Sequence, residues 1–447
     1  MIYLLLITFL LMLFLTYKKF DNDIIAPPVV LVTGYTFSII CASVNVEKWG
    51  INLHFNTFFV LVYGTLLFIF TGYFVKKYIQ KSNNGTFKNN LVNIEVNYKY
   101  LYVYIVFQIV VMILWCWNIC TVTDSLGNFN SFSERMVAFR KWSSYSTSWL
   151  NNYVYIFINQ FNQISSLSPY IIIYFIINEY ILNKKVNNLL FFSVSLSILQ
   201  IFLTGARGGV VYLVFISLLY YCVLYKFHYN QFFNIDKKLI LKFIILFFVG
   251  SISFYYIKAL VGRGAGDIKI ENIIPYLTMY AGGSIQLLDM FLQNPIEVSN
   301  IWGKEVFSTL NFQLIRLGIL DIQPYISHLE FRTASTGVFL GNVYTAYRSY
   351  IYDFGFMGLT ILPVIFSFIV NFLYYNIILK FNDNSINLKL LFYALVFPSI
   401  FFDFARCIFY SQKFSFVTVK QFIILLILTS IFVKGVSIKD LIKRIYK

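Results

Sequence analysis

The sequence predicts an all-α polytopic integral membrane protein with about 11 transmembrane helices and one large folded extracytoplasmic loop. Two observations lead to this fold class. Of the 447 residues, 59% are hydrophobic and only 12% are charged, whereas a soluble chain of this length carries about a quarter charged residues. The apolar residues also fall into runs of about twenty, the length that an α-helix needs to cross the hydrocarbon core of a bilayer.

The apolar runs define the predicted spans. The first run has no basic start and no small-residue cleavage site, so we interpret it as a retained span and not as a signal peptide. The predicted spans are residues 2–17, 24–44, 54–75, 100–120, 163–182, 188–203, 210–225, 239–259, 354–379, 388–410 and 421–433. They divide the chain into a transmembrane bundle (1–259) with a small outer loop (121–160), a large extracytoplasmic loop (260–353), and a second bundle with a basic cytoplasmic tail (354–447).

Basic residues near the span ends orient the chain. Cytoplasmic loops carry an excess of Lys and Arg, and an outer N-terminus with a cytoplasmic C-terminus puts 20 of the 35 basic residues inside. The net charge of +16 therefore reflects membrane topology and does not indicate nucleic-acid binding. Eight of the nine arginines fall on the outer side, namely Arg135, Arg140, Arg207, Arg263, Arg316, Arg332, Arg348 and Arg406.

This arginine bias indicates a phosphate or diphosphate held at the outer face. Lysine suffices as a point charge for topology, whereas the planar guanidinium of arginine binds phosphate through two parallel hydrogen bonds. Chance combined with interfacial anchoring is the alternative interpretation.

Two glycine-rich segments place an arginine at the outer membrane boundary. Thr204–Gly209, with the sequence TGARGG, joins two predicted spans and contains Arg207. Val261–Asp267, with the sequence VGRGAGD, opens the large loop and contains Arg263. Glycines allow tight turns, and successive backbone amides can form an anion-binding nest. A tight turn with a snorkelling arginine is the alternative for the first segment.

The large loop is predicted to be folded, because its apolar residues recur at helical spacing. Residues 273–291 and 306–317 are expected to form two amphipathic helices at the membrane interface. Packing within the loop explains the same spacing equally well.

Three titratable residues of the loop region are candidates for proton transfer. His328 and Glu330 stand close to Arg332, so either a helical or an extended backbone places a base beside a cation. Asp353 precedes the ninth span, together with Arg348. A solvated loop explains the group around His328 nearly as well.

The remaining polar residues near spans are Asp403, Arg406 and His54. Charges within a membrane face a cavity or pair with one another, and both readings fit Asp403 and Arg406, which are three residues apart. His54 is interpreted as an interfacial residue. We expect neither a metal ion nor a cofactor, because no cluster of acidic residues, histidines or cysteines has ligand spacing.

Several short segments between residues 200 and 375 resemble a known family. They are Thr204–Gly209, Tyr280–Ser284 with Asp289, Gly303–Phe307, Ser335–Gly337, Gly341–Thr345 and Asp353–Gly355. Together with the many spans and the single large outer loop, they resemble the oligosaccharide repeat-unit polymerases of bacterial surface polysaccharides, the O-antigen (Wzy-type) polymerases.

The resemblance implies a GT-C-like glycosyltransferase in the bacterial plasma (inner) membrane. It would polymerise undecaprenyl-diphosphate-linked oligosaccharide repeat units into an O-antigen or capsule, with membrane lipid and a chain-length regulator protein as further partners. Such a reaction needs a base, for which the candidates are His328, Glu330 and Asp353. It also needs cations at the leaving diphosphate, for which the candidates are Arg207, Arg263, Arg332, Arg348 and Arg406.

Two other functions suit the same sequence features. An O-antigen ligase would pass the glycan to a different acceptor. A flippase or other transporter of lipid-linked oligosaccharides would carry it across the membrane, but transporters are expected to have internally repeated halves and charged spans. The odd number of predicted spans and the single dominant loop favour a transferase.

We predict that the loop at 260–353 lies on the outer side of the membrane. Cysteines introduced as Ser299→Cys and Ser327→Cys should react with a membrane-impermeant thiol reagent in intact spheroplasts, because the basic residues place this loop away from the cytoplasm. The unsubstituted chain, with its five native cysteines, serves as the control. Labelling that occurs only after lysis would contradict the orientation and the outer arginine site that depends on it.

Overall fold

The computed structural model describes residues 1–82, 91, 93–205, 208–229, 273–325, 327, 329–379 and 386–445. This part of the chain is mostly helical and forms an all-α protein of the membrane-embedded type. Six helical segments within it are long and apolar enough to cross a membrane. They are Ile2–Lys19, Phe55–Ser82, Tyr98–Asp124, Tyr153–Asn183, Gly208–Tyr229 and Ala346–Leu379.

The chain divides into two compact units. The first consists of Met1–Phe87, Ile270–Phe381 and Leu395–Thr418, and the second consists of Lys88–Lys269, Asn382–Ala394 and Val419–Lys447. Helices α15 (Leu388–Val396) and α17 (Phe416–Phe432) each contain residues of both units.

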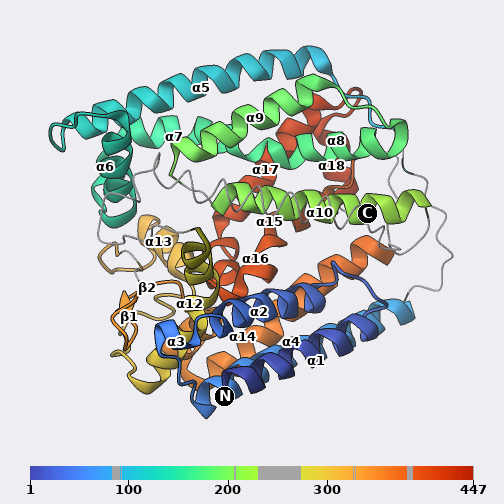
Figure 1. Cartoon of the computed structure of the whole chain (residues 1–447). Helices are drawn as coiled ribbons and strands as arrows, with labels where there is room; N and C mark the ends of the chain where they lie inside the picture. The colour runs from blue at the N-terminus through green and yellow to red at the C-terminus, as the bar shows by residue number, and fades with distance from the viewer. Residues whose placement is uncertain are drawn as a thin grey trace. The chain divides into compact units, whose positions relative to one another are not determined.

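The first unit combines long apolar helices with most of the predicted large loop (Figure 1). Its helices are α1 (Ile2–Lys19), α2 (Pro27–Ser43), α3 (Val46–Trp49), α4 (Phe55–Ser82), α12 (Ile273–Gln293), α13 (Ser308–Arg316), α14 (Ala346–Leu379) and α16 (Pro398–Phe401), followed by a 3₁₀ turn (Phe402–Phe404) and a π-helical turn (Phe409–Lys413). Strands β1 (Arg332–Thr333) and β2 (Phe339–Gly341) form an antiparallel pair.

Helices α4 and α14 pack along their lengths as parallel helices (Figure 1). The hydroxyl of Tyr63 lies 3.3 Å from that of Thr360, and Ser367 Oγ donates a hydrogen bond of 2.6 Å to the carbonyl of Phe68. The contacts advance in the same direction on both helices. The N-termini of α4 and α14 therefore lie at the same end of the unit.

Helix α14 begins earlier than the predicted ninth span and is kinked near the predicted start. Gly355 has φ 58° and ψ −148° inside the helix, a conformation that only glycine adopts without strain. The turns before the kink contain the polar residues Arg348, Ser349 and Asp353. Because of these residues, the sequence predicts a loop here. The turns are helical because these side chains bind other segments of the unit, as described below.

Both amphipathic helices predicted in the large loop are confirmed as helices, α12 and α13. Helix α12 packs closely on α2. Ser38 Oγ donates a 2.7 Å hydrogen bond to the carbonyl of Ala281, and a Cβ added at Gly282 would lie 2.5 Å from the backbone nitrogen of Ala42. Glycine at 282 is therefore required by the close approach of the two backbones.

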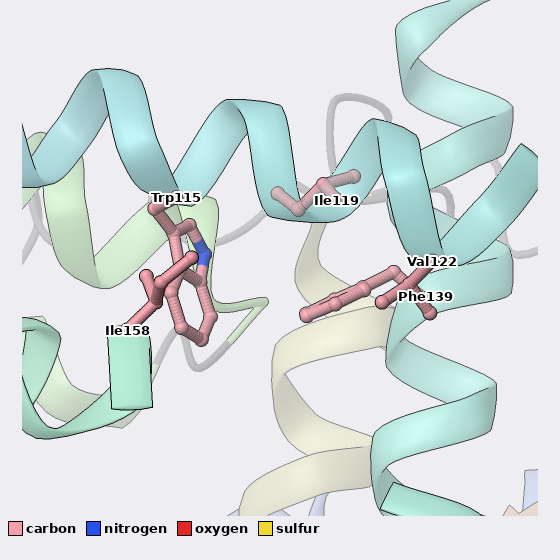
Figure 2. Close-up of a cluster of buried hydrophobic side chains, with 5 residues drawn as sticks. All are labelled: Trp115, Ile119, Val122, Phe139 and Ile158. Atoms are coloured by element: carbon pink, nitrogen blue, oxygen red, sulfur yellow. The ribbon is translucent and has the colours of Figure 1, made fainter. Parts of the chain in front are cut away.

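The second unit is built around α5 (Tyr98–Asp124). Its other elements are α6 (Phe132–Tyr145), a 3₁₀ turn (Ser148–Asn151), α7 (Tyr153–Leu167), α8 (Pro169–Asn183), α9 (Asn188–Leu203), α10 (Gly208–Tyr229) and α18 (Ile438–Ile445). Figure 2 shows how Phe139 of α6 points toward Val122 and Ile119 of α5, in a buried cluster that also contains Trp115 and Ile158.

This cluster explains why the predicted small loop at 121–160 is largely helical. Helix α6 is polar on average but buries Met136 and Phe139, and its N-cap residue Ser131 accepts a hydrogen bond from the backbone of Glu134. The cap and the apolar face, together with the contact of Arg135 with Asp124 of α5, hold this polar helix in place.

Two predicted spans are divided between helices in the structure. Residues 163–182 fall on α7 and α8, but Ser168 between them keeps a helical conformation, so Tyr153–Asn183 remains one apolar segment. Residues 388–410 break into α15, α16 and a 3₁₀ turn at Pro398, because proline has no N–H for the helix ladder. The predicted span at 239–259 lies outside the described residues.

The packing of α12 on α2 predicts opposite effects at two adjacent glycines. Gly282→Ala should destabilise the protein by about 1–3 kcal/mol, because the added methyl meets backbone atoms of α2. Gly283→Ala should be neutral or slightly stabilising, because its nearest neighbour would be the carbonyl of Leu340 at 3.5 Å and alanine favours the helix. Thermal unfolding of the detergent-solubilised variants measures both effects. Equal midpoints for the two variants would contradict this packing.

Candidate functional site

The described residues between Asn294 and Asp353 form a polar layer at the N-terminal end of α14. Two residues of α14 hold the layer in place. Asp353 Oδ2 accepts hydrogen bonds from the backbone nitrogens of Glu305 (3.0 Å) and Val306 (2.7 Å), and the hydroxyl of Tyr352 accepts one from the nitrogen of Ser299 (3.2 Å). These bonds use backbone groups of the loop, so they fix its path independently of most of its side chains.

Arg348 lies at the centre of this layer and is fully buried. Its Nη1 forms an ion pair with Glu305 Oε2, which also accepts a 2.9 Å hydrogen bond from Ser349 Oγ. Three aromatic rings surround the guanidinium, with Cζ 4.7 Å from the ring centroid of Phe291 and 4.9 Å from those of Tyr344 and Tyr352. Cation–π attraction is strengthened when the charge is removed from water.

The three aromatic rings compensate for the N–H donors of Arg348 that form no hydrogen bond with the described residues. Nε and Nη2 of Arg348 are buried without hydrogen-bond partners among the described residues, and such donors are costly unless another interaction compensates them. Arg348 is fully buried, so in this conformation no diphosphate contacts its guanidinium. Arg348 therefore has the geometry of a residue that positions the layer.

Glu330 and Arg332 form a second ion pair nearer the surface. Arg332 Nη2 lies 2.5 Å from Glu330 Oε1 and donates a 2.7 Å hydrogen bond to the carbonyl of Asn294. The side chain of Glu330 is 27% exposed and that of Arg332 is 13% exposed. Arg332 begins β1, where it pairs with Gly341 of β2. Both contacts use Nη2 of Arg332, so the N–H groups on Nε and Nη1 take no part in these two contacts.

Tyr344 connects the two ion pairs. Its ring covers Arg348, and its hydroxyl donates to the carbonyl oxygen of Glu330 at 3.2 Å. Burial raises the pKa of Tyr344, and the nearby carboxylate of Glu330 raises it further. The hydroxyl thus remains a neutral donor at physiological pH.

A third polar group joins α12 to the start of α4. Asp289 is buried in α12, and its Oδ2 lies 2.9 Å from Nδ1 of His54. Its Oδ1 accepts hydrogen bonds from the backbone nitrogen of His54 (2.9 Å) and from Thr57 Oγ1 (2.6 Å). The His54 side chain is 49% exposed, whereas that of Asp289 is 3% exposed.

The structure brings some of the predicted site residues together and leaves others apart. Glu330, Arg332, Arg348 and Asp353 all belong to the polar layer, although Asp353 is occupied by backbone amides. Arg207, Arg263 and His328 lie outside the described residues.

Asp403 and Arg406 differ in burial. Asp403 is buried and its Oδ2 accepts a 2.9 Å hydrogen bond from the hydroxyl of Tyr35. Arg406 is exposed. The sequence allows two interpretations of these residues, in which they either pair with one another or face a cavity. The described contacts give Asp403 a different partner, the hydroxyl of Tyr35 on α2.

Sequence reasoning missed two participants of the site, His54 and Glu305. Nothing in the sequence near His54 marks it, because its partner Asp289 is far away along the chain. The available signal was Asp289, a lone carboxylate in an otherwise apolar helix, since a buried carboxylate needs donors. Within the described residues, no group of three histidine, cysteine or acidic side chains has an arrangement that could hold a metal ion.

Comparisons with known proteins do not assign the chain to a family. No protein-family model matches the sequence, and searches of curated proteins and of solved structures found no match to it.

The buried pair predicts a large loss of stability when one partner is neutralised. Glu305→Gln should lower the free energy of unfolding by about 3–5 kcal/mol, because it leaves Arg348 buried without its counter-charge. The double variant Glu305→Gln/Arg348→Met should recover much of this loss, because it removes the stranded charge. Unfolding midpoints of the purified variants measure both.

Glu330→Gln is the matched control for the buried pair. It breaks an ion pair that is partly open to solvent, so its cost should be about 1 kcal/mol or less. If the double variant Glu305→Gln/Arg348→Met were less stable than Glu305→Gln alone, the role of the buried ion pair would be contradicted.

Proposed function

We propose that this protein is a membrane glycosyltransferase that polymerises undecaprenyl-diphosphate-linked oligosaccharide repeat units into a surface polysaccharide on the outer side of the plasma membrane. In this proposal the chain has a GT-C-like architecture of eleven spans, and the polar layer faces outward. One observation carries the proposal. A layer of carboxylates and guanidinium groups is built onto the ends of the apolar helices α4 and α14.

The layer suits a reaction between two lipid-linked sugars. An acceptor hydroxyl attacks the anomeric carbon of the donor, the bond to undecaprenyl diphosphate breaks, and the diphosphate leaves with the electron pair. Cations fixed near the membrane stabilise the leaving diphosphate. Arg332 and the exposed Arg406 are the described candidates, with Arg207 and Arg263 proposed from their positions in the sequence.

Arg348 and Asp353 have a different role in this proposal. They keep the layer in place through Glu305 and the neighbouring backbone, so they act on the substrate only indirectly. Positioning of this kind matters because a small displacement of the reacting groups lowers the rate strongly.

Transport is the second candidate function, and the buried contacts argue against it. A transporter alternates between conformations in which its central groups change partners. The Arg348–Glu305 pair, the three rings around it and the Asp353 hydrogen bonds instead hold one arrangement. An O-antigen ligase shares the proposed chemistry and differs only in the acceptor.

The proposal is tested with purified protein in liposomes and a lipid-linked repeat unit as the only substrate. A ladder of polymer bands is the expected result, because each product is a donor for the next transfer. A ligase would need a second acceptor and would give no ladder, and a flippase would move the substrate without changing it. Either result would contradict the proposed polymerase activity.

Substitutions of arginine test the diphosphate site. Arg207→Ala and Arg263→Ala should each reduce polymer formation about 10²–10³-fold, the usual effect of removing one donor to a developing anion. Arg207→Lys should fall short of the wild type as well, because lysine keeps the charge but loses the fork.

The control is Arg135→Lys in the second unit, where Arg135 pairs with Asp124. This variant should build nearly normal ladders. Full-length ladders from both alanine variants, at matched membrane levels, would show that the outer arginines serve only as anchors.

A further inference from the structure

The contact between His54 and Asp289 has the geometry of an oriented base. Asp289 accepts three hydrogen bonds, from Nδ1 and the backbone nitrogen of His54 and from Thr57 Oγ1. Because a carboxylate accepts and does not donate, Nδ1 of His54 carries the proton in this contact. The second ring nitrogen, Nε2, is then the acceptor.

His54 is also accessible, unlike its partner. Its side chain is half exposed while that of Asp289 is buried. A buried acid that holds an accessible imidazole in one tautomer is the arrangement by which a histidine takes a proton from a substrate hydroxyl.

His54 lies directly before α4, and this position suits a lipid-linked substrate. Further along α4, the ring of Tyr63 stacks on the exposed rings of Phe59 and Phe356, at centroid distances of 5.3 and 5.4 Å. Tyrosine is one of the two residue types that gather where a membrane meets water. A polyprenyl diphosphate likewise holds its charged headgroup at the boundary between membrane and water.

The polar layer approaches the same end of α4. The turn between β1 and β2 contacts the backbone just before His54, where Thr336 Oγ1 donates a 2.7 Å hydrogen bond to the carbonyl of Lys48. Helix α12 contributes to both places, because Asp289 contacts His54 and Phe291 covers Arg348.

We infer that His54 is the general base of the transfer and that Asp289 is its positioning residue, an inference that rests on the proposed function. As the acceptor hydroxyl oxygen forms its bond to the anomeric carbon, its proton passes to His54 Nε2. The bond from that carbon to the diphosphate breaks, and the diphosphate keeps the electron pair. The imidazolium then releases the proton to water and restores the base.

A purely structural role would have a different signature. Asp289 also accepts the backbone nitrogen of His54 at the start of α4, so it caps that helix from a second helix. If capping were its only role, the ring of His54 could be replaced without loss of turnover.

The experiment measures polymerisation of a lipid-linked repeat unit by the full-length chain in liposomes. His54→Gln should lower kcat about 10²–10⁴-fold with little change in KM, because glutamine keeps a polar side chain but cannot take the proton. Asp289→Asn should lower kcat through the wrong tautomer, with folding checked by its unfolding midpoint. The matched control is His228→Gln, which removes a histidine of the second unit and should leave kcat unchanged.

Chemical rescue separates catalysis from structure. In His54→Ala, imidazole added to the buffer should restore part of kcat, because the half-exposed position admits a small base. Imidazole should not restore Asp289→Asn.

A His54→Gln variant with at least half of the wild-type kcat, or a His54→Ala variant that imidazole does not rescue, overturns the inference while the polymerase function stands. A wild-type protein that forms no ladder overturns the proposed function itself, and the inference with it.

Discussion

The ion pair between Arg348 and Glu305 is the interaction on which the rest of the first unit depends. Removing two charges from water costs several kcal/mol per ion, and the unit offsets this cost with Ser349 and the three surrounding rings. These groups come from α12, from α14 and from the segments between them. The pair can exist only when all of these segments are in place, so the charge itself selects one arrangement of the layer.

The parallel packing of α4 and α14 determines where that layer acts. Because the two N-termini lie at one end, residues from the first hundred positions meet residues from the large loop. His54 contacts Asp289, and Lys48 contacts Thr336. A candidate site assembled in this way draws on both the apolar helices and the loop, and neither part contains it alone.

Composition and periodicity predicted the helical membrane class and both helices of the loop, because burial of apolar faces dominates those elements. They did not predict the interruption at Pro398 within an otherwise apolar run or the early start of α14. In the site, Glu330 and Arg332 are close in sequence and were found together. His54 and Glu305 were missed because their partners are distant along the chain. Pairing between distant positions produces no periodic pattern in the sequence.

The attachment of the loop by Asp353 has an evolutionary consequence. Asp353 binds the backbone nitrogens of Glu305 and Val306 and not their side chains, and every residue except proline supplies such a nitrogen. Much of the loop surface is thereby free to drift without detaching from α14. Under the proposed function, lineages under pressure to alter their surface glycans would change specificity in this loop while inheriting the same membrane helices.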